Sequence, residues 1–280
     1  MTTLSFRIVN VFTRADDRFS GNPLCVFEDG RSLDPQQMQS LALQFNLSET
    51  TFLLPSTRAN AAVRIFTPRY EMAFAGHPTL GSAQVCRALG VAGDSLTLEM
   101  QVGVIPVTAA GRKWTLEATA RGWREVDESP EKLAEILGLR AGDIAERPLW
   151  VNAGREQMVV PLTSEEAVRR LNVRSDLLTR LHGADGVGMV YVFAQGDDRA
   201  LARFFFPQGS TVIEDPATGS AATNLGGWLL AMGRSLPAEV EISQGEHTGR
   251  PSLLHLRVDA QRRIFVSGEV IELGRGTIDL

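Results

Sequence analysis

Short stretches in which apolar and polar side chains alternate dominate this sequence, and such alternation is typical of β-strands. The first is Ser5-Phe-Arg-Ile-Val-Asn-Val-Phe12, which is rich in β-branched and aromatic residues. We predict strands at residues 5–12, 24–27, 51–54, 62–66, 149–152, 157–161, 187–193, 201–206, 239–243, 253–258, 263–266 and 268–272, with three more between 95 and 116. Helices are predicted at 36–45, 78–89, 127–143, 165–171 and 216–232. The pattern therefore indicates many short strands and few helices.

Two of the predicted helices share a phrase before and at their start. The first phrase has Arg-Ile-Phe-Thr-Pro at 64–68 and Gly-Ser-Ala at 81–83, and the second has Arg-Phe-Phe-Phe-Pro at 203–207 and Gly-Ser-Ala at 219–221. Aligning the two Gly-Ser-Ala triplets gives an offset of 138 residues (219 minus 81), about half of the 280-residue chain. A repeat of this length predicts a duplicated domain, and ligands tend to bind where such halves meet.

Both of these helices are rich in small residues. The small residues are Gly81, Ser82 and Ala83 in the first helix, and Gly219, Ser220, Ala221, Ala222, Gly226 and Gly227 in the second. A glycine costs about 1 kcal/mol in a helix interior, so its repeated use needs a packing reason. Ordinary tight helix packing explains either copy alone. Because both copies have the same composition, we predict a helix that is enclosed by a curved sheet.

A polar residue precedes proline at each predicted helix start, in His77-Pro78 and Asp215-Pro216. Proline is favoured at the first helical position, and aspartate is a common N-cap, which by itself explains Asp215. The free N–H groups and the positive dipole end of a helix start also attract anions. Because the chain is acidic overall, we expect this anion to be a small carboxylate substrate.

Glu49 lies in Asn-Leu-Ser-Glu-Thr-Thr-Phe (46–52), immediately before an apolar strand. One interpretation is a solvated carboxylate at the strand entrance, or a cap for the loop. The other is a general acid/base whose pKa is tuned by burial. The spacing alone favours the first interpretation.

The composition excludes several classes of partner. The net charge of −5 and the pI near 5.5 argue against nucleic-acid and membrane partners, which need a basic surface. The N-terminal residues lack the features of a signal peptide, and no apolar run is long enough to span a bilayer. Two cysteines are typical of a reducing cytoplasm, and the four histidines lack metal-ligand spacing. We therefore expect a cytoplasmic protein without a metal.

Four phrases, in order along the chain, resemble the phenazine-biosynthesis PhzF-like family: Gly-Asn-Pro at 21–23, Ser-Glu-Thr at 48–50, Phe-Ala-Gly-His-Pro-Thr-Leu-Gly at 74–81 and Asp-Pro-Ala-Thr-Gly-Ser-Ala at 215–221. This family has the fold of diaminopimelate epimerase. The resemblance implies an α+β protein with two pseudo-symmetric domains, each a curled, mostly antiparallel β-sheet or barrel around a central helix. It implies domains at 1–120 (with a C-terminal strand at about 266–280) and at 121–265, and an active site in the cleft between them.

The resemblance also implies a cofactor-independent isomerase that acts as a homodimer. In the isomerase that names the family, a glutamate in the strand-entrance phrase moves a proton within trans-2,3-dihydro-3-hydroxyanthranilate, and Glu49 occupies this phrase here. His77 and Asp215 are implied as polar partners that face Glu49 across the cleft. The implied contacts to a substrate carboxylate are Gly76, Gly219 and Ser220, with Asn22 and Arg250 as weaker ones.

One departure from related enzymes narrows the chemistry. Diaminopimelate epimerases and proline racemases use a pair of cysteines near these helix starts, whereas Cys25 and Cys86 both lie in apolar segments and are expected in the core. Glu49 is present in one half only, because its counterpart at an offset of 139 is Gly188. The preferred interpretation is one-base proton transfer by Glu49. The alternatives are a single-base racemase or epimerase, and a non-catalytic protein of the same fold that binds a small acid or acts through protein partners.

Overall fold

The computed structural model describes residues 2–118 and 120–280, which form two compact units. Unit 1 contains the residues up to Glu117 together with Ser267–Leu280, and unit 2 contains Ala118–Val266. The chain therefore passes from one unit to the other twice. Among the described residues, no helix is both long and apolar enough to cross a membrane.

Unit 1 is a closed barrel of eight strands. Its elements are β1 (Thr3–Thr13), β2 (Asn22–Phe27), α1 (Pro35–Phe45), β3 (Glu49–Leu54), β4 (Ala61–Phe66), β5 (Glu71–Met72), α2 (Gly76–Ala88), β6 (Ser95–Met100), β7 (Gly103–Ala110), β8 (Lys113–Ala118) and β17 (Ile264–Asp279). The strands pair in the order β1–β2–β3–β4–β6–β7–β8–β17, and β17 pairs again with β1. The pairs β2–β3 and β4–β6 are parallel.

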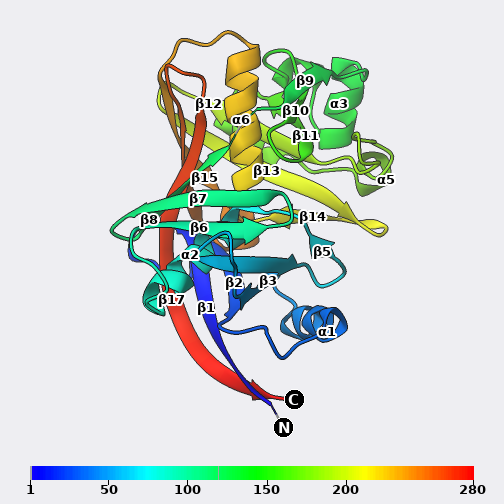
Figure 1. Ribbon diagram of the computed structural model, residues 1–280. Helices are drawn as coiled ribbons and strands as arrows, with labels where there is room; N and C mark the ends of the chain where they lie inside the picture. Colours follow the sequence, from blue (N-terminus) through cyan, green and yellow to red (C-terminus); the bar gives the residue numbers. More distant parts are fainter. Residues whose placement is uncertain (1, 119) are drawn as a thin grey trace. The chain divides into compact units, whose positions relative to one another are not determined.

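Helix α2 lies inside this barrel, and ten of its thirteen residues are buried. Figure 1 shows it among the strands of unit 1, several of which it contacts. The interior of an eight-stranded barrel is narrow, so an enclosed helix must present small side chains to the strands. A Cβ atom on Gly81 would lie 2.5 Å from the Leu24 side chain and 3.1 Å from those of Val9 and Val11. The prediction of an enclosed helix is confirmed.

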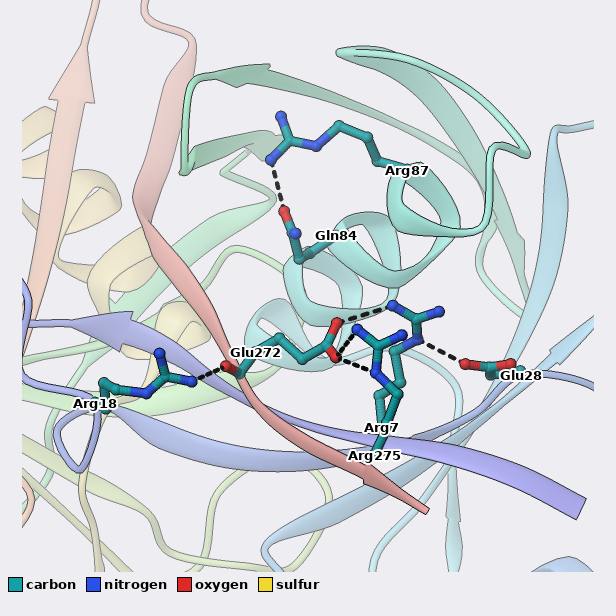
Figure 2. A network of polar contacts seen from close by, with 7 residues as sticks. All are labelled: Arg7, Arg18, Glu28, Gln84, Arg87, Glu272 and Arg275. Atoms are coloured by element: carbon teal, nitrogen blue, oxygen red, sulfur yellow. Dashed lines mark hydrogen bonds and ion pairs between the residues drawn. The ribbon is translucent and has the colours of Figure 1, made fainter. Parts of the chain in front are cut away.

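A charged cluster fixes the C-terminal strand to the first two strands. Arg7 on β1 is 7% exposed, and its guanidinium donates to Glu28 at 2.6 Å and to Glu272 of β17 at 2.8 Å. Figure 2 shows Arg275 beside the same Glu272 carboxylate, and Arg18 donating to the Glu272 carbonyl at 2.8 Å. A buried guanidinium needs such partners, so the cluster keeps β17 in place beside β1.

Unit 2 repeats this plan. Its elements are β9 (Gly122–Glu125), α3 (Pro130–Leu137), η1 (Ala141–Asp143), β10 (Leu149–Asn152), β11 (Glu156–Pro161), α4 (Glu165–Arg170), α5 (Ser175–Leu178), β12 (Val190–Gln195), β13 (Arg199–Gln208), β14 (Thr211–Asp215), α6 (Gly219–Ala231), β15 (Ala238–Gln244), η2 (Glu246–Thr248) and β16 (Ser252–Val258). The pairs β10–β11, β12–β13 and β15–β16 are antiparallel, whereas β11–β12 and β13–β15 are parallel. The pairs from β1 to β7 have the same series of directions.

Helix α6 is the counterpart of α2, and eleven of its thirteen residues are buried. A Cβ atom on Gly226 would lie 2.8 Å from the Ile264 side chain, and one on Gly227 would lie 2.6 Å from Val151. The glycines that weaken the helix by propensity therefore allow strands to pack directly against its backbone.

The repeated Arg-x-Phe phrases form the same ion pair in both units. Arg64 donates two hydrogen bonds of 2.7 Å to Glu71, and its guanidinium lies 5.1 Å from the centre of the Phe66 ring. Arg203 donates to Glu214 at 2.9 and 2.7 Å, and its guanidinium lies 4.9 Å from the centre of the Phe205 ring. Two-point arginine–carboxylate pairs fix geometry as well as charge. Each pair joins a barrel strand to the short strand that leads toward the central helix.

The two central helices do not begin at the positions that the sequence repeat predicts. Helix α2 begins at Gly76 and α6 begins at Gly219, which is an offset of 143 residues (219 minus 76) instead of 138. The Gly-Ser-Ala triplets are therefore not equivalent, because Gly81 is the sixth residue of its helix and Gly219 is the first. Asp215 is the last residue of β14 and the N-cap is Thr218, so the interpretation of Asp215 as a helix cap is also wrong.

Two further differences concern element lengths. The helix expected at 127–143 is interrupted at Gly138, where the backbone has a φ of 65°, so α3 and η1 are separate. The two strands expected at 263–266 and 268–272 are one strand, β17, because residues up to Asp279 pair with β1.

We expect that replacing Gly81 by valine lowers the free energy of unfolding by about 1–3 kcal/mol, because the added atoms overpack the space between α2 and the strands. Gly93→Val is the control, since no described atom except those of its chain neighbours lies within 4 Å of a Cβ atom at this position. Urea denaturation of both variants measures the difference. Equal effects of the two substitutions would contradict the close packing of α2.

Candidate active site

Glu49 and His77 lie next to each other in unit 1. Glu49 is the first residue of β3, and its side chain is 15% exposed. His77 is the second residue of α2 and is 6% exposed. The distance from Nε2 of His77 to Oε2 of Glu49 is 3.2 Å, a close polar contact whose angles are not those of a hydrogen bond. The expectation that His77 faces Glu49 from the opposite half is therefore wrong, because both side chains belong to the same unit.

Burial keeps His77 neutral. It lowers the pKa of the imidazole from 6.5 to about 3, so the ring carries no charge near neutral pH. A neutral imidazole has one N–H donor and one acceptor nitrogen. His77 therefore places a neutral polar group, and no full positive charge, beside the Glu49 carboxyl group.

Two further predicted contacts lie in unit 1. Asn22 is the first residue of β2 and is fully buried, in a pair with Val11 of β1. Gly21, which precedes it, has a φ of 79°, and a Cβ atom there would lie 2.5 Å from the Val11 carbonyl, so only glycine fits this turn. Gly76 is the first residue of α2, directly before His77. Asn22 and Gly76 are thus fixed by the starts of two elements.

Asp215 lies at the end of β14 in unit 2, where two polar side chains bond to it, those of Thr218 and Gln244. The hydroxyl of Thr218 donates to its carboxylate. Gln244, which is fully buried, donates from Nε2 to the Asp215 carbonyl at 2.9 Å and to the Thr218 hydroxyl at 3.1 Å. The buried glutamine therefore orients both the backbone and the hydroxyl that hold this carboxylate.

Gly219 and Ser220 are the first two residues of α6. The N–H groups of Ala221 and Ala222 both bond to the Thr218 carbonyl, at 3.1 and 3.0 Å, so helical bonding begins at these residues. The N–H groups of the first residues of a helix have no partner within the helix and can bind an anion. The structure places both residues where the sequence predicts anion-binding groups.

Arg250 follows η2 in a loop that packs beside Asp215. Its N–H donates to the Gly245 carbonyl at 3.1 Å. Gly245 has a φ of 84°, and a Cβ atom there would collide with the carbonyls of both Arg250 and Pro216. The backbone of this loop is therefore close to the segment that follows Asp215.

Four polar residues of this region are absent from the sequence prediction: Gln157, Thr218, Asn224 and Gln244. Each is at most 9% exposed. Gln157 and Asn224 bond to each other and, through Gln157, to Ser220. A polar residue inside an apolar strand or helix was the available signal, since buried polar groups need hydrogen-bond partners. The spacing of these residues in the sequence does not predict their hydrogen-bond partners.

The counterpart of Glu49 in unit 2 is apolar. Glu49 pairs with Leu24, the third residue of β2, and Val190 pairs in the same way with Met158, the third residue of β11. The counterpart is therefore Val190, and the predicted counterpart Gly188 is wrong. The inference that one half alone carries this carboxylate is unchanged.

Both cysteines are core residues, as expected. Cys25 and Cys86 are fully buried, and burial raises the pKa of both thiols, that of Cys86 to about 12. A nucleophilic or basic cysteine must form a thiolate, which these surroundings disfavour. Thiol-based proton transfer by these two residues is therefore disfavoured.

Comparisons with known proteins agree with these features. The sequence model of a family described as "Phenazine biosynthesis-like protein" matches residues 9–276. An uncharacterized isomerase from Pasteurella multocida is 37% identical, over 99% of this chain and 95% of its own. The trans-2,3-dihydro-3-hydroxyanthranilate isomerase of Pseudomonas fluorescens is 35% identical, over 99% of both chains.

The solved structures agree in fold. The crystal structure of a PhzF-family protein from Bacillus anthracis covers all of both chains with a TM-score of 0.86 at 22% identity. The expected α+β fold, that of diaminopimelate epimerase, is confirmed by such likenesses. Relatives of this identity over the full length also confirm that the protein is an isomerase. The chain therefore belongs to the phenazine-biosynthesis PhzF-like family.

Proposed function

We propose that this protein moves a proton within a small carboxylate substrate without a cofactor, and that Glu49 carries the proton. The observation that supports this most directly is the partly buried Glu49 carboxyl group, 3.2 Å from the neutral imidazole of His77. A carboxylate in such surroundings can act as a general base and, once protonated, as a general acid. The 35% identity to trans-2,3-dihydro-3-hydroxyanthranilate isomerase suggests a similar substrate.

The proposed reaction has two steps. The Glu49 carboxylate removes a proton from one carbon of the substrate, and the electron pair left behind spreads over the adjacent double bonds. The protonated Glu49 then returns the proton to another carbon of the same conjugated system, so the double bonds shift and the enzyme is restored. His77 remains neutral beside this carboxyl group, since an imidazolium there would weaken Glu49 as a base.

The groups of unit 2 fit recognition of the substrate carboxylate. The N–H groups of Gly219 and Ser220 lie at the positive end of the α6 dipole, which favours a negative charge. The backbone of the Arg250 loop lies close to Pro216, and we assign Arg250 as a cationic contact for the substrate carboxylate. We assign Asp215 as a polar partner of the reacting substrate, and Asn22 and Gly76 as further contacts from unit 1.

We also expect a homodimer in the cytoplasm without nucleic-acid or membrane partners. The net charge of −5 supports the last two expectations, since both surfaces repel an acidic protein. Light scattering coupled to size-exclusion chromatography measures the mass in solution, and a mass of about 30 kDa would contradict the dimer.

We expect Glu49→Gln to lower kcat on trans-2,3-dihydro-3-hydroxyanthranilate by at least about 10³-fold, because the amide cannot accept the proton. The circular dichroism spectrum of the variant should equal that of the unsubstituted protein, which would show that the fold is unchanged. Glu117→Gln is the control, since Glu117 is an exposed carboxylate at the end of β8, and its activity should equal that of the unsubstituted protein. Full turnover by the Glu49 variant would rule out this residue as the proton carrier.

The type of isomerisation is read from the product formed in D₂O. A double-bond shift gives a new absorption spectrum, and NMR shows whether the transferred hydrogen is retained or exchanged. Deuterium at a stereocentre without any spectral change would identify a racemase or epimerase instead.

His77 predicts a specific dependence of stability on pH. Because its pKa is about 3 in the folded protein and 6.5 when unfolded, the unfolded chain binds the additional proton in this range. Stability is therefore complete above pH 6.5 and falls as the pH decreases. Between pH 6.5 and pH 5 the loss from this residue is up to about 2 kcal/mol. Urea denaturation at several pH values should show that the free energy of unfolding falls less with decreasing pH in His77→Gln than in the unsubstituted protein. The same dependence on pH in both proteins would show that His77 is not buried as a neutral group.

A further inference from the structure

A chain of buried amides lies behind the Ser220 hydroxyl in unit 2. Gln157 is the second residue of β11 and is 1% exposed, and Asn224 is the sixth residue of α6 and is fully buried. Amide groups at such depth require partners for both their N–H₂ and their C=O ends. The partners they find determine which way each amide points.

The orientation of Asn224 is fixed by the backbone. Its Oδ1 accepts a hydrogen bond of 2.7 Å from the N–H of Ala153, which can only donate. Its Nδ2 therefore faces the other way, and donates to the Arg155 carbonyl at 2.9 Å and to Oε1 of Gln157 at 2.8 Å. A reversed amide would place donor against donor at Ala153 and acceptor against acceptor at Arg155.

Asn224 in turn fixes Gln157. Because Oε1 of Gln157 accepts from Asn224, Nε2 is the end that faces Ser220, and it donates to the Ser220 oxygen at 3.0 Å. Ser220 has a single hydroxyl proton, and this proton must point away from the Gln157 N–H₂ group. Within the described part of the chain, Gln157 is the side chain that bonds to this hydroxyl, and Ser220 itself is partly exposed.

We propose that Asn224 and Gln157 are positioning residues that make the Ser220 hydroxyl a donor toward the substrate carboxylate at the start of α6. This inference rests on the proposed function, in which the α6 start binds that carboxylate. Ser220 then adds an O–H donor to the N–H groups of the same helix turn. A carboxylate can only accept hydrogen bonds, so a site of fixed donors selects it over a group that must donate.

The equivalent positions of unit 1 lack this arrangement. The second residue of α2 is His77 where α6 has Ser220, and the sixth is Gly81 where α6 has Asn224. Gly81 packs against apolar side chains of β1 and β2. The amide chain is therefore not a requirement of the barrel fold, which supports a role in recognition.

A double-mutant cycle tests the inference, with Ser220→Ala, Gln157→Met and the two combined. The readouts are KM and kcat on trans-2,3-dihydro-3-hydroxyanthranilate, and the Kd of anthranilate by calorimetry. We expect Ser220→Ala and Gln157→Met each to raise KM and Kd by about tenfold, with a smaller change in kcat. When Ser220→Ala is already present, Gln157→Met should change KM and Kd by less than about twofold, because the effect of Gln157 passes through Ser220. Gln195→Met, an exposed glutamine at the end of β12, is the control.

Equal effects of Gln157→Met in both backgrounds would overturn the inference and leave a structural role. Absence of saturable anthranilate binding to the unsubstituted protein would also overturn it. If Glu49→Gln loses turnover but the effects of Ser220→Ala and Gln157→Met simply add, the proposed function would stand and the inference would fail. If instead the protein has no turnover but anthranilate binding depends on the coupling between Gln157 and Ser220, the inference would stand and the proposed function would fail.

If the Gln157→Met variant does not fold, Gln157→Glu tests the same inference. An ionised carboxylate still accepts from Asn224 but would also accept from Ser220, which turns the hydroxyl proton away from the ligand. We expect a raised KM at pH 8 that falls severalfold as the introduced carboxyl is protonated and donates again. The change should be smaller when Ser220→Ala is present, since no hydroxyl remains to be reversed. A KM that does not depend on pH, or equal dependence in both backgrounds, would contradict the inference.

Discussion

Each unit depends on packing strands directly against the backbone of a buried helix. The barrel of unit 1 leaves too little room for ordinary side chains on every face of α2, so Gly81 allows Leu24 and two valines to approach the helix backbone. Gly226 has the same function in α6. Close packing restrains such a helix from shifting or rotating, so its first residues have well-defined positions. Both units place polar groups on those first residues, where catalysis requires accurate positions.

The duplicated architecture and the divergent chemistry are separable. The Arg64–Glu71 and Arg203–Glu214 pairs are equivalent and support the same strand arrangement in both units. The second helical residue differs, since one unit presents an imidazole beside Glu49 and the other presents a hydroxyl backed by two amides. The framework repeats because packing requires it, whereas these positions are free to differ and thus carry separate tasks.

The sequence predicts those parts that depend on local signals. The alternating pattern of β1 and the Asp34 capping box of α1 are readable because neighbouring residues decide them. The short strand β5 forms because β4 pairs with it, and the register of the helix starts follows from the barrels. The Gln157–Asn224 contact joins residues 67 positions apart, so no local pattern reveals it. Glu49 and His77 were identified as candidates, but their direct contact was seen only in the structure.

The path of β17 has a consequence for the order of assembly. Its last residues pair with the first strand, with Thr3 opposite Asp279, and they close the ring of unit 1. A chain emerging from the ribosome therefore has all strands of unit 2, apart from the start of β17, before the barrel of unit 1 can close. Until then, β1 and β8 present unpaired edges, which are prone to aggregation. The half that is synthesised first is the last to be completed, and loss of only the C-terminal residues would leave it open.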